Sequence, residues 1–133
     1  INLIVYGLFP GAHCKDIGCP GKLYVQEHGN LTMICSYDVS YKEHNKYWCK
    51  GSSFLQCTVL NDTKQTVSST TNPWISISDI KKKTAFYIPM NNVRQEDKGR
   101  YWCDVSVIFT DKNCPVDITM KKGKNPNSSV NVL

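Results

Sequence analysis

The sequence lacks the cysteine patterns that bind zinc or carry out thiol redox chemistry. It has no C-x-x-C pair, and its three histidines, His13, His28 and His44, do not fall at zinc-finger spacings. It nevertheless contains seven cysteines, which is unusual for a cytosolic protein without such a motif. The composition therefore predicts an extracellular protein stabilised by disulfides.

Long apolar runs and an extended basic face are also missing. No run of about eighteen or more apolar residues is present, so we expect any membrane anchor to lie beyond Leu133. The formal net charge is +5, and the lysine clusters at 81–83 and 121–124 are not interleaved with aromatic residues, as they would be in a nucleic-acid site. We expect these lysines to lie in solvated turns and predict no nucleic-acid partner.

The chain has the length of one domain with two flanking stretches. Residues 1–14 begin apolar and end with small residues, so they resemble the end of a secretory signal; the alternative is a short apolar strand that packs on the domain. We place the domain at residues 15–122 and the start of a stalk or linker at 123–133, which is rich in Asn, Ser and Lys. The glycosylation sequons begin at Asn30, Asn61 and Asn127.

Three residues have the spacing of an immunoglobulin sandwich. Trp48 follows Cys35 by 13 residues, and Cys103 follows Cys35 by 68. In that fold one disulfide joins two sheets and the indole packs on it. Short alternating segments predict strands at 23–25, 31–37, 45–50, 56–60, 74–78, 84–89, 100–108 and 116–121. The length between Cys57 and Pro73 leaves room for an extra edge strand, so we predict an all-β, V-type two-sheet sandwich with Greek-key connections.

The other cysteines predict two further disulfides. Cys49 and Cys57 are eight residues apart across a Gly-Ser turn, which lets neighbouring strands face each other. Cys19 precedes the first strand and Cys114 begins the last, and these strands are neighbours in a V-type domain. The competing pairing is Cys14 with Cys114, which leaves Cys19 free. In either scheme six of the seven cysteines have structural partners. We therefore do not expect an enzyme with a cysteine nucleophile.

The segment from Asp97 to Cys103 has a structural logic at each position. Tyr101 precedes the second cysteine by two residues, which suits a tyrosine corner. Gly99 permits a turn that a side chain would strain. Asp97 is suited to accept backbone amides or to pair with a cation. With Trp48, we expect these residues to maintain the fold.

Two Tyr-Trp-Cys triplets, one within Lys46–Lys50 and one within Asp97–Cys103, narrow the prediction. Together with Cys57 they resemble the V-type domains of the leukocyte mono-immunoglobulin-like (CMRF-like) receptors and of the polymeric immunoglobulin receptor. The resemblance covers residues 19–122. Family members carry an arginine that pairs with the aspartate matching Asp97, whereas this chain has Pro73-Trp74 there. We expect Lys64 or backbone amides to take over that role.

The resemblance implies a receptor ectodomain, on a type I membrane protein or secreted, that binds through three loops at one end. In this sequence the loops are roughly 38–45, 51–56 and 107–114. Some leukocyte members bind phosphatidylserine and related lipids with a calcium ion, and the polymeric receptor binds immunoglobulin. We therefore expect an immune cell-surface receptor for an anionic phospholipid or a protein ligand. The alternatives are an immunoglobulin-transport receptor domain and a secreted soluble protein.

The first loop offers candidate ligand contacts in Tyr41, Lys42 and His44, whose mixed aromatic and charged character suits protein interfaces.

The last loop combines apolar and oxygen-bearing side chains. Ile108 and Phe109 are suited to enter a bilayer, and Asp111 and Asn113 to bind Ca²⁺ with carbonyls, water and lipid phosphate. The alternative, which the sequence favours, is that Phe109 packs on the sheet and Asp111 makes a hydrogen bond within the turn.

Overall fold

The computed structural model describes residues 2–5, 16–64 and 76–121. Within these ranges the chain forms short strands joined by tight turns, several of them 3-10 helices. The strands are β1 (Asn2–Val5), β2 (Ile17–Gly18), β3 (Lys22–Gln26), β4 (Asn30–Tyr37), β5 (Lys46–Lys50), β6 (Thr58–Asp62), β7 (Ser78–Ile80), β8 (Ala85–Met90), β9 (Gly99–Val105) and β10 (Lys112–Lys121). The 3-10 helices are η1 (Val39–Tyr41), η2 (Phe54–Gln56), η3 (Lys81–Lys83) and η4 (Gln95–Asp97).

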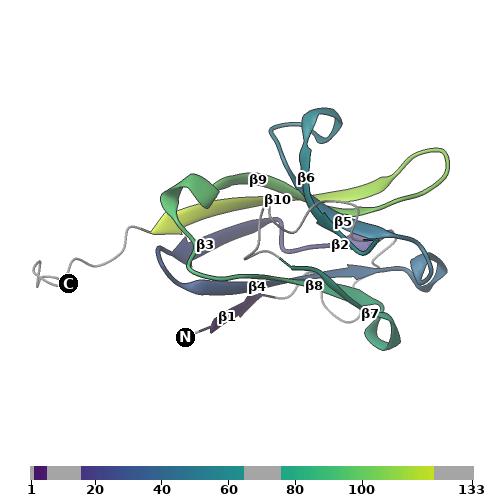
Figure 1. Cartoon of the computed structure of the whole chain (residues 1–133), viewed down its shortest axis with the longest axis horizontal. Coiled ribbons are helices and arrows are strands. Elements are labelled where there is room, and N and C mark those ends of the chain that lie inside the picture. The colour runs from purple at the N-terminus through teal and green to yellow at the C-terminus, as the bar shows by residue number, and fades with distance from the viewer. Residues whose placement is uncertain (1, 6–15, 65–75, 122–133) are drawn as a thin grey trace, which may run out of the picture.

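The strands form two sheets that pack as the layers of a sandwich (Figure 1). One sheet has the order β1-β4-β8-β7, with β2 also paired to β4, and the other has the order β3-β10-β9-β5-β6. β1 is parallel to β4 and β3 is parallel to β10, while the other described pairs are antiparallel. The chain passes from one sheet to the other after β2, β3, β4, β6 and β8. The predicted all-β, V-type sandwich is confirmed.

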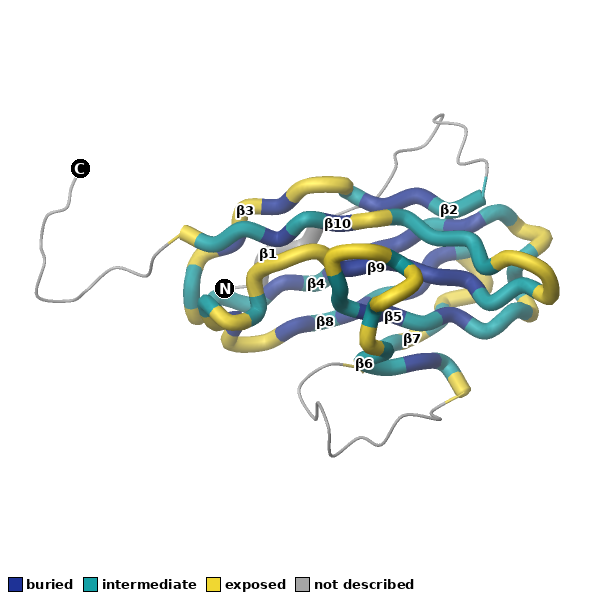
Figure 2. The backbone as a smooth tube through the Cα atoms, turned by 90° about the horizontal axis from the view of Figure 1, so that it is seen from above, coloured by how far each residue is buried: buried dark blue, intermediate teal, exposed yellow. Residues whose placement is uncertain are grey.

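The core between the sheets is formed by side chains at alternate positions of the strands. In β4, Leu31, Met33 and Cys35 point inward and are buried, as a period of two requires. Trp48 of β5 stacks on Tyr101 of β9, with ring centroids 5.0 Å apart and the planes 13° from parallel. Figure 2 shows the buried residues along the strands and the exposed ones at the turns.

Three disulfides cross-link the domain, and all three predicted pairs are confirmed. Cys35–Cys103 joins the two sheets, Cys49–Cys57 joins β5 to the start of β6, and Cys19–Cys114 ties the N-terminal segment to β10. The competing pairing of Cys14 with Cys114 is wrong, because Cys114 is bonded to Cys19. The described cysteines are therefore all in disulfides.

The signature around Asp97 is also structural. The Tyr101 hydroxyl donates to the Asp97 carbonyl, which is the predicted tyrosine corner, and Gly99 has φ of +137°. The Asp97 carboxylate accepts the amide of Arg94 at 2.8 Å. A backbone amide thus satisfies Asp97, one of the two substitutes expected for the missing arginine.

Several predicted boundaries shift. The strand expected at 74–78 begins only at Ser78, and the strand expected at 100–108 ends at Val105. The extra edge strand was expected between Cys57 and Pro73. Residues 65–73 of that stretch, like the predicted stalk at 123–133, lie outside the described residues.

The N-terminal segment contains a described strand. Residues 2–5 pair in parallel with β4, a geometry that fits the alternative of an apolar N-terminal strand. Processing of residues 1–14 as a signal stays a prediction. In the described ranges, no helix has the length and apolar character needed to cross a bilayer.

Candidate ligand-binding end

Strand register brings two predicted binding loops to the same end of the sandwich. Lys46, the first residue of β5, lies opposite Val105, the last residue of β9. The β4–β5 loop (residues 38–45) and the β9–β10 loop (residues 106–111) therefore emerge side by side. Ser36 lies opposite Ala85, which brings the η3 turn to this end as well. These three segments form what we call the loop end (Figure 1).

The third predicted loop lies elsewhere. Residues 51–56 follow the other end of β5, where the Gly51 amide donates to the Arg100 carbonyl at 3.0 Å. In Figure 1, η2 projects at the top of the view, away from the loop end. Placing this loop with the other two was wrong, because successive connections of an antiparallel strand lie at opposite ends of the sheet.

The β9–β10 loop is held in shape by Asp111. One carboxylate oxygen accepts the Val107 amide at 2.9 Å, and the other accepts the Tyr47 hydroxyl. This confirms the turn hydrogen bond, but Phe109 does not pack on the sheet. Ile108 and Phe109 are 88% and 96% exposed at the tip of the loop.

The β4–β5 loop is organised by its own polar side chains. Asp38 caps η1 by accepting the Ser40 hydroxyl at 2.5 Å and the Ser40 amide at 2.9 Å, and these two hydrogen bonds lower the pKa of Asp38. The Tyr41 hydroxyl donates to Asp16 at 2.8 Å, which raises the pKa of Tyr41. The loop is therefore anchored to the segment before β2.

His44 connects the two loops directly. Its Nδ1–H donates to the Ser106 carbonyl at 2.9 Å, since a carbonyl can only accept. The ring also meets Tyr41 edge to face, with centroids 5.5 Å apart. Five of the predicted contact residues thus lie at the loop end: Tyr41, Lys42, His44, Ile108 and Phe109.

A buried polar network lies beneath these loops. Lys46 points inward and is 0% exposed; its Nζ donates to Asp79 at 2.7 Å and to the Lys42 carbonyl at 2.9 Å. The Tyr37 hydroxyl donates to the other Asp79 oxygen at 2.6 Å, and Lys46 Nζ lies 4.1 Å from the Tyr37 ring centroid. Burial, followed by the Asp79 interaction, raises the pKa of Tyr37. The network fastens the backbone of the β4–β5 loop to β7.

Neither Lys46 nor Asp79 was predicted to take part in the site. The alternation of side chains along a strand could have identified Lys46 as buried, because Lys46 precedes Trp48 by two residues and so shares its inward face. No comparable signal identified Asp79, because its partner is 33 residues away in the sequence.

Lysines of η3 add positive charge to the loop end. Lys81, Lys82 and Lys83 are exposed, and Lys81 pairs with Glu43 of the β4–β5 loop at 2.8 Å. Thr84 ends this turn in the left-handed region, with φ of +45°. These lysines are in a solvated turn, as expected, and the turn faces the same side as the two loops.

The calcium prediction gains no support from the geometry. Both oxygens of Asp111 already accept hydrogen bonds, and Asn113 lies in β10 opposite Asp104 rather than at the loop tip. Across the described ranges, no group of three His, Cys, Asp or Glu side chains is arranged to hold a metal ion.

The sequons occupy different parts of the domain. Asn30 accepts the Asn92 amide through its side chain, and Asn61 accepts the amide of Asp62, each at its own strand. Asn127 lies outside the described residues. Glycosylation at the three sites stays a prediction.

Two sheets joined by Cys35–Cys103 beside Trp48, with loops gathered at one end, define an immunoglobulin variable-type domain. The chain matches the family model of the immunoglobulin V-set domain over residues 19–119, and it belongs to that family. The disulfides and the family indicate an extracellular domain.

Curated relatives refine this assignment. The chain is 32% identical over 126 residues to CMRF35-like molecule 7 of Mus musculus, a match that covers 94% of this chain and 59% of the relative. It is 32% identical over 96 residues to CMRF35-like molecule 2 of Homo sapiens, covering 72% and 47% respectively. The chain thus spans about half the length of these relatives. The resemblance inferred from the sequence is confirmed.

Solved structures share the same fold. The first Ig domain of the mouse polymeric immunoglobulin receptor superposes with a TM-score of 0.73 at 20% identity, covering 83% of this chain and 97% of that domain. The teleost fish polymeric Ig receptor ectodomain superposes with a TM-score of 0.68 at 27% identity, covering 77% of this chain and 48% of that one.

Proposed function

We propose that this domain is the ligand-binding ectodomain of an immune cell-surface receptor, and that its ligand is an anionic phospholipid surface. The observation that carries this is the tip of the β9–β10 loop, where Ile108 and Phe109 are 88% and 96% exposed. Two adjacent large apolar side chains that are exposed to water mark a binding surface, because covering them with a ligand lowers the free energy. Insertion into the boundary between headgroups and acyl chains would cover both.

Rigid support for the tip strengthens the proposal. Asp111 fixes the loop through Val107 and Tyr47, so the apolar pair is presented rather than collapsed onto the sheet. A preorganised tip loses less conformational entropy when it binds.

Charge at the loop end favours a negative partner. Lys82 and Lys83 are exposed on the η3 turn next to the β4–β5 loop, while Lys81 beside them is paired with Glu43. Anionic lipids attract such residues, and salt screens the attraction. In this proposal the apolar tip inserts into the membrane, and the lysines make binding to negatively charged membranes stronger than binding to neutral ones.

A protein ligand is the second candidate. The β4–β5 loop presents Tyr41, Lys42 and His44, and the 27% identity to a teleost polymeric Ig receptor supports a shared mode of protein recognition. Immunoglobulin is the ligand that this relationship suggests. A transport receptor or a secreted protein would place the same domain in a different full-length chain.

Vesicle binding tests the proposal. We expect the folded domain to float with vesicles of phosphatidylcholine and phosphatidylserine, and not with phosphatidylcholine alone. Replacing Ile108 and Phe109 together by serine should weaken binding at least tenfold, since burying each side chain contributes about 1.5–3 kcal/mol. Measurements with Ca²⁺ and with a chelator decide whether the ion takes part.

The matched control is Leu55→Ser. Leu55 is 94% exposed but lies in η2, away from the loop end. Its replacement should leave vesicle binding unchanged. If the folded wild-type domain binds neither vesicle with or without Ca²⁺, the lipid assignment fails and the protein ligand takes its place.

A further inference from the structure

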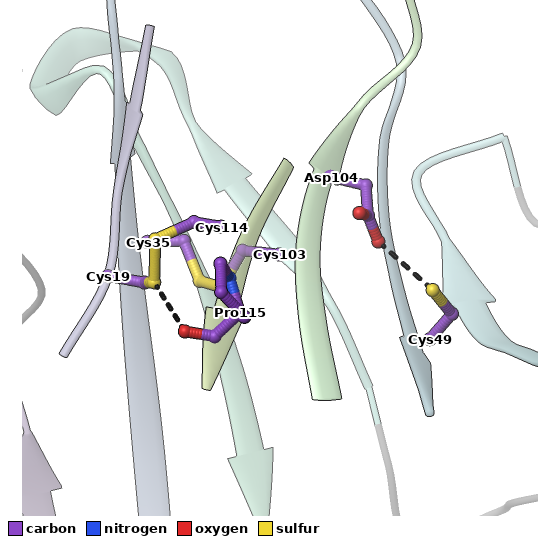
Figure 3. The surroundings of a disulfide bond; sticks show 7 residues. All are labelled: Cys19, Cys35, Cys49, Cys103, Asp104, Cys114 and Pro115. Carbon is purple, nitrogen blue, oxygen red and sulfur yellow. Dashed lines mark hydrogen bonds between the residues drawn. A yellow bond between two sulfur atoms is a disulfide. The ribbon is translucent and has the colours of Figure 1, made fainter. Parts of the chain in front are cut away.

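The Cys49–Cys57 disulfide has a buried carboxyl group beside it. On the outer face of the β9–β5 pair, Asp104 lies opposite Tyr47, and Cys49 lies opposite Trp102. Asp104 Oδ2 is 3.3 Å from Cys49 Sγ, and both residues are 0% exposed. Figure 3 shows the Asp104 carboxyl group pointing at this sulfur, on the far side of β9 from Cys35–Cys103.

A hydrogen bond at this contact requires a protonated carboxyl group. A sulfur in a disulfide carries no hydrogen, so the hydrogen bond exists only if the Asp104 hydroxyl donates to Sγ. Its other oxygen, Oδ1, is buried without a hydrogen-bond partner among the described residues. A carboxylate left so poorly solvated would be costly.

The groups facing Asp104 do not offer it a cation. Tyr47 faces it from β5 and Asp111 from the β9–β10 loop, while Asp62 of β6 lies opposite Tyr47. Lys46 and Lys112 both lie opposite Val105, whose side chain is on the inward face. Burial, and then the charge of Asp111, raise the pKa of Asp104 to about 8.

The two cysteines of this disulfide differ in exposure. Cys49 is buried, whereas Cys57, between η2 and β6, is partly exposed. We therefore expect an incoming thiolate to reach Cys57, so that Cys49 becomes the leaving group. A buried cysteine thiolate is unfavourable, so departure of Cys49 needs a proton at its sulfur.

We propose that Cys49–Cys57 is a thiol-exchange site at which Asp104 protonates the leaving sulfur. A thiolate from a small-molecule or protein thiol bonds to Sγ of Cys57 while the bond between the two protein sulfurs breaks. The electron pair of that bond passes to Cys49 Sγ, which takes the proton of Asp104. The products are a mixed disulfide on Cys57, a Cys49 thiol and an Asp104 carboxylate; a second thiol then releases Cys57.

Exchange would release the hairpin between β5 and β6. The disulfide closes this short loop, in which Phe54 meets Trp102 edge to face with centroids 5.8 Å apart. This site is separate from the loop end and does not depend on lipid binding.

Site-resolved exchange tests the proposal. The oxidised 133-residue chain is incubated with glutathione at pH 7, quenched by alkylation and mapped by peptide mass spectrometry. We expect glutathione on Cys57 and an alkylated Cys49, with Cys35–Cys103 and Cys19–Cys114 intact. Asp104→Asn keeps the shape of the side chain but removes the transferable proton, so exchange should slow at least tenfold.

The control is Asp117→Asn, which removes an exposed carboxylate paired with Arg100 and leaves the disulfide untouched. Its exchange rate should equal that of the wild type. In the wild-type protein, the rate constant per thiolate should fall as pH rises from 7 to 9 and Asp104 loses its proton.

Three results would overturn the proposal. They are glutathione attached to Cys49, simultaneous exchange of all three disulfides, and a wild-type rate per thiolate that does not fall with pH. The wild-type measurements decide the question even if Asp104→Asn does not fold.

Discussion

Lys46 and Asp79 form an ion pair inside the sandwich, directly beneath the loop end, with Nζ 2.7 Å from Oδ2. The Lys46 side chain is fully buried, and the pair links β5 to β7 across the two sheets. Because Lys46 also donates to the Lys42 carbonyl, the pair sets the position of the β4–β5 loop as well as joining the layers.

Breaking this pair on one side should be costly. Lys46→Met leaves the Asp79 carboxylate with Tyr37 but without its cation, and Asp79→Asn leaves a buried ammonium group without a carboxylate. We expect each to lower the free energy of unfolding by about 3–5 kcal/mol, whereas the double variant should cost clearly less than the sum. Urea denaturation of the four proteins measures the coupling.

The surface pair Lys81–Glu43 is the control, because both side chains are largely exposed. Lys81→Met should hardly change stability. Additive losses in the Lys46 and Asp79 variants would show that the two side chains do not depend on each other.

Asp104 should make stability fall as pH rises. Its pKa is raised to about 8 in the folded protein, while an unfolded aspartate titrates near 4. Between these values the folded state holds a proton that the unfolded state has released, so the free energy of unfolding decreases with pH. The slope approaches about 1.4 kcal/mol per pH unit.

The test compares the wild type with Asp104→Asn by urea denaturation from pH 4.5 to 9. We expect the variant to gain stability relative to the wild type up to about pH 8, and the difference to level off above it. Taking the difference removes carboxylates such as Asp38 and Asp117, whose lowered pKa values give the opposite slope in acid. A difference that does not vary with pH would mean that Asp104 is already ionised in the fold.

Asp111 should control the order of the β9–β10 loop. Asp111→Ala leaves the Val107 amide and the Tyr47 hydroxyl without their acceptor. We expect faster hydrogen exchange at the Val107 amide and a loss of about 1–3 kcal/mol of stability. Thr110→Ala, in the same loop at an exposed position, should change neither. Unchanged protection of Val107 in Asp111→Ala would show that other contacts order the loop.

Local spacing was enough to predict the frame of the fold. Cys35, Trp48 and Cys103 indicated the sandwich through their characteristic spacing, and Cys49 with Cys57 indicated the hairpin clamp because they flank a short turn. The tyrosine corner of Tyr101 likewise involves a carbonyl only four residues away.

The binding end was predicted only in part. Tyr41, His44 and Phe109 do gather there, but residues 51–56 do not, and Phe109 is exposed rather than packed. Exposure of a loop side chain depends on how the loop is anchored. Here the anchor is Tyr47, 64 residues from Asp111 in the sequence.

The sequence by itself determined the class of fold, the Cys35–Cys103 and Cys49–Cys57 disulfides and, by resemblance, the family, because these follow from residue types at short or characteristic spacings. The partner of Cys114 was open between Cys19 and Cys14, and the tertiary structure joins it to Cys19. Only the tertiary structure decided which charges become buried. Lys46 meets Asp79, and Asp104 meets the Cys49 sulfur, because strands distant in the chain are packed side by side. Burial strengthens such contacts, since water no longer competes for the polar groups.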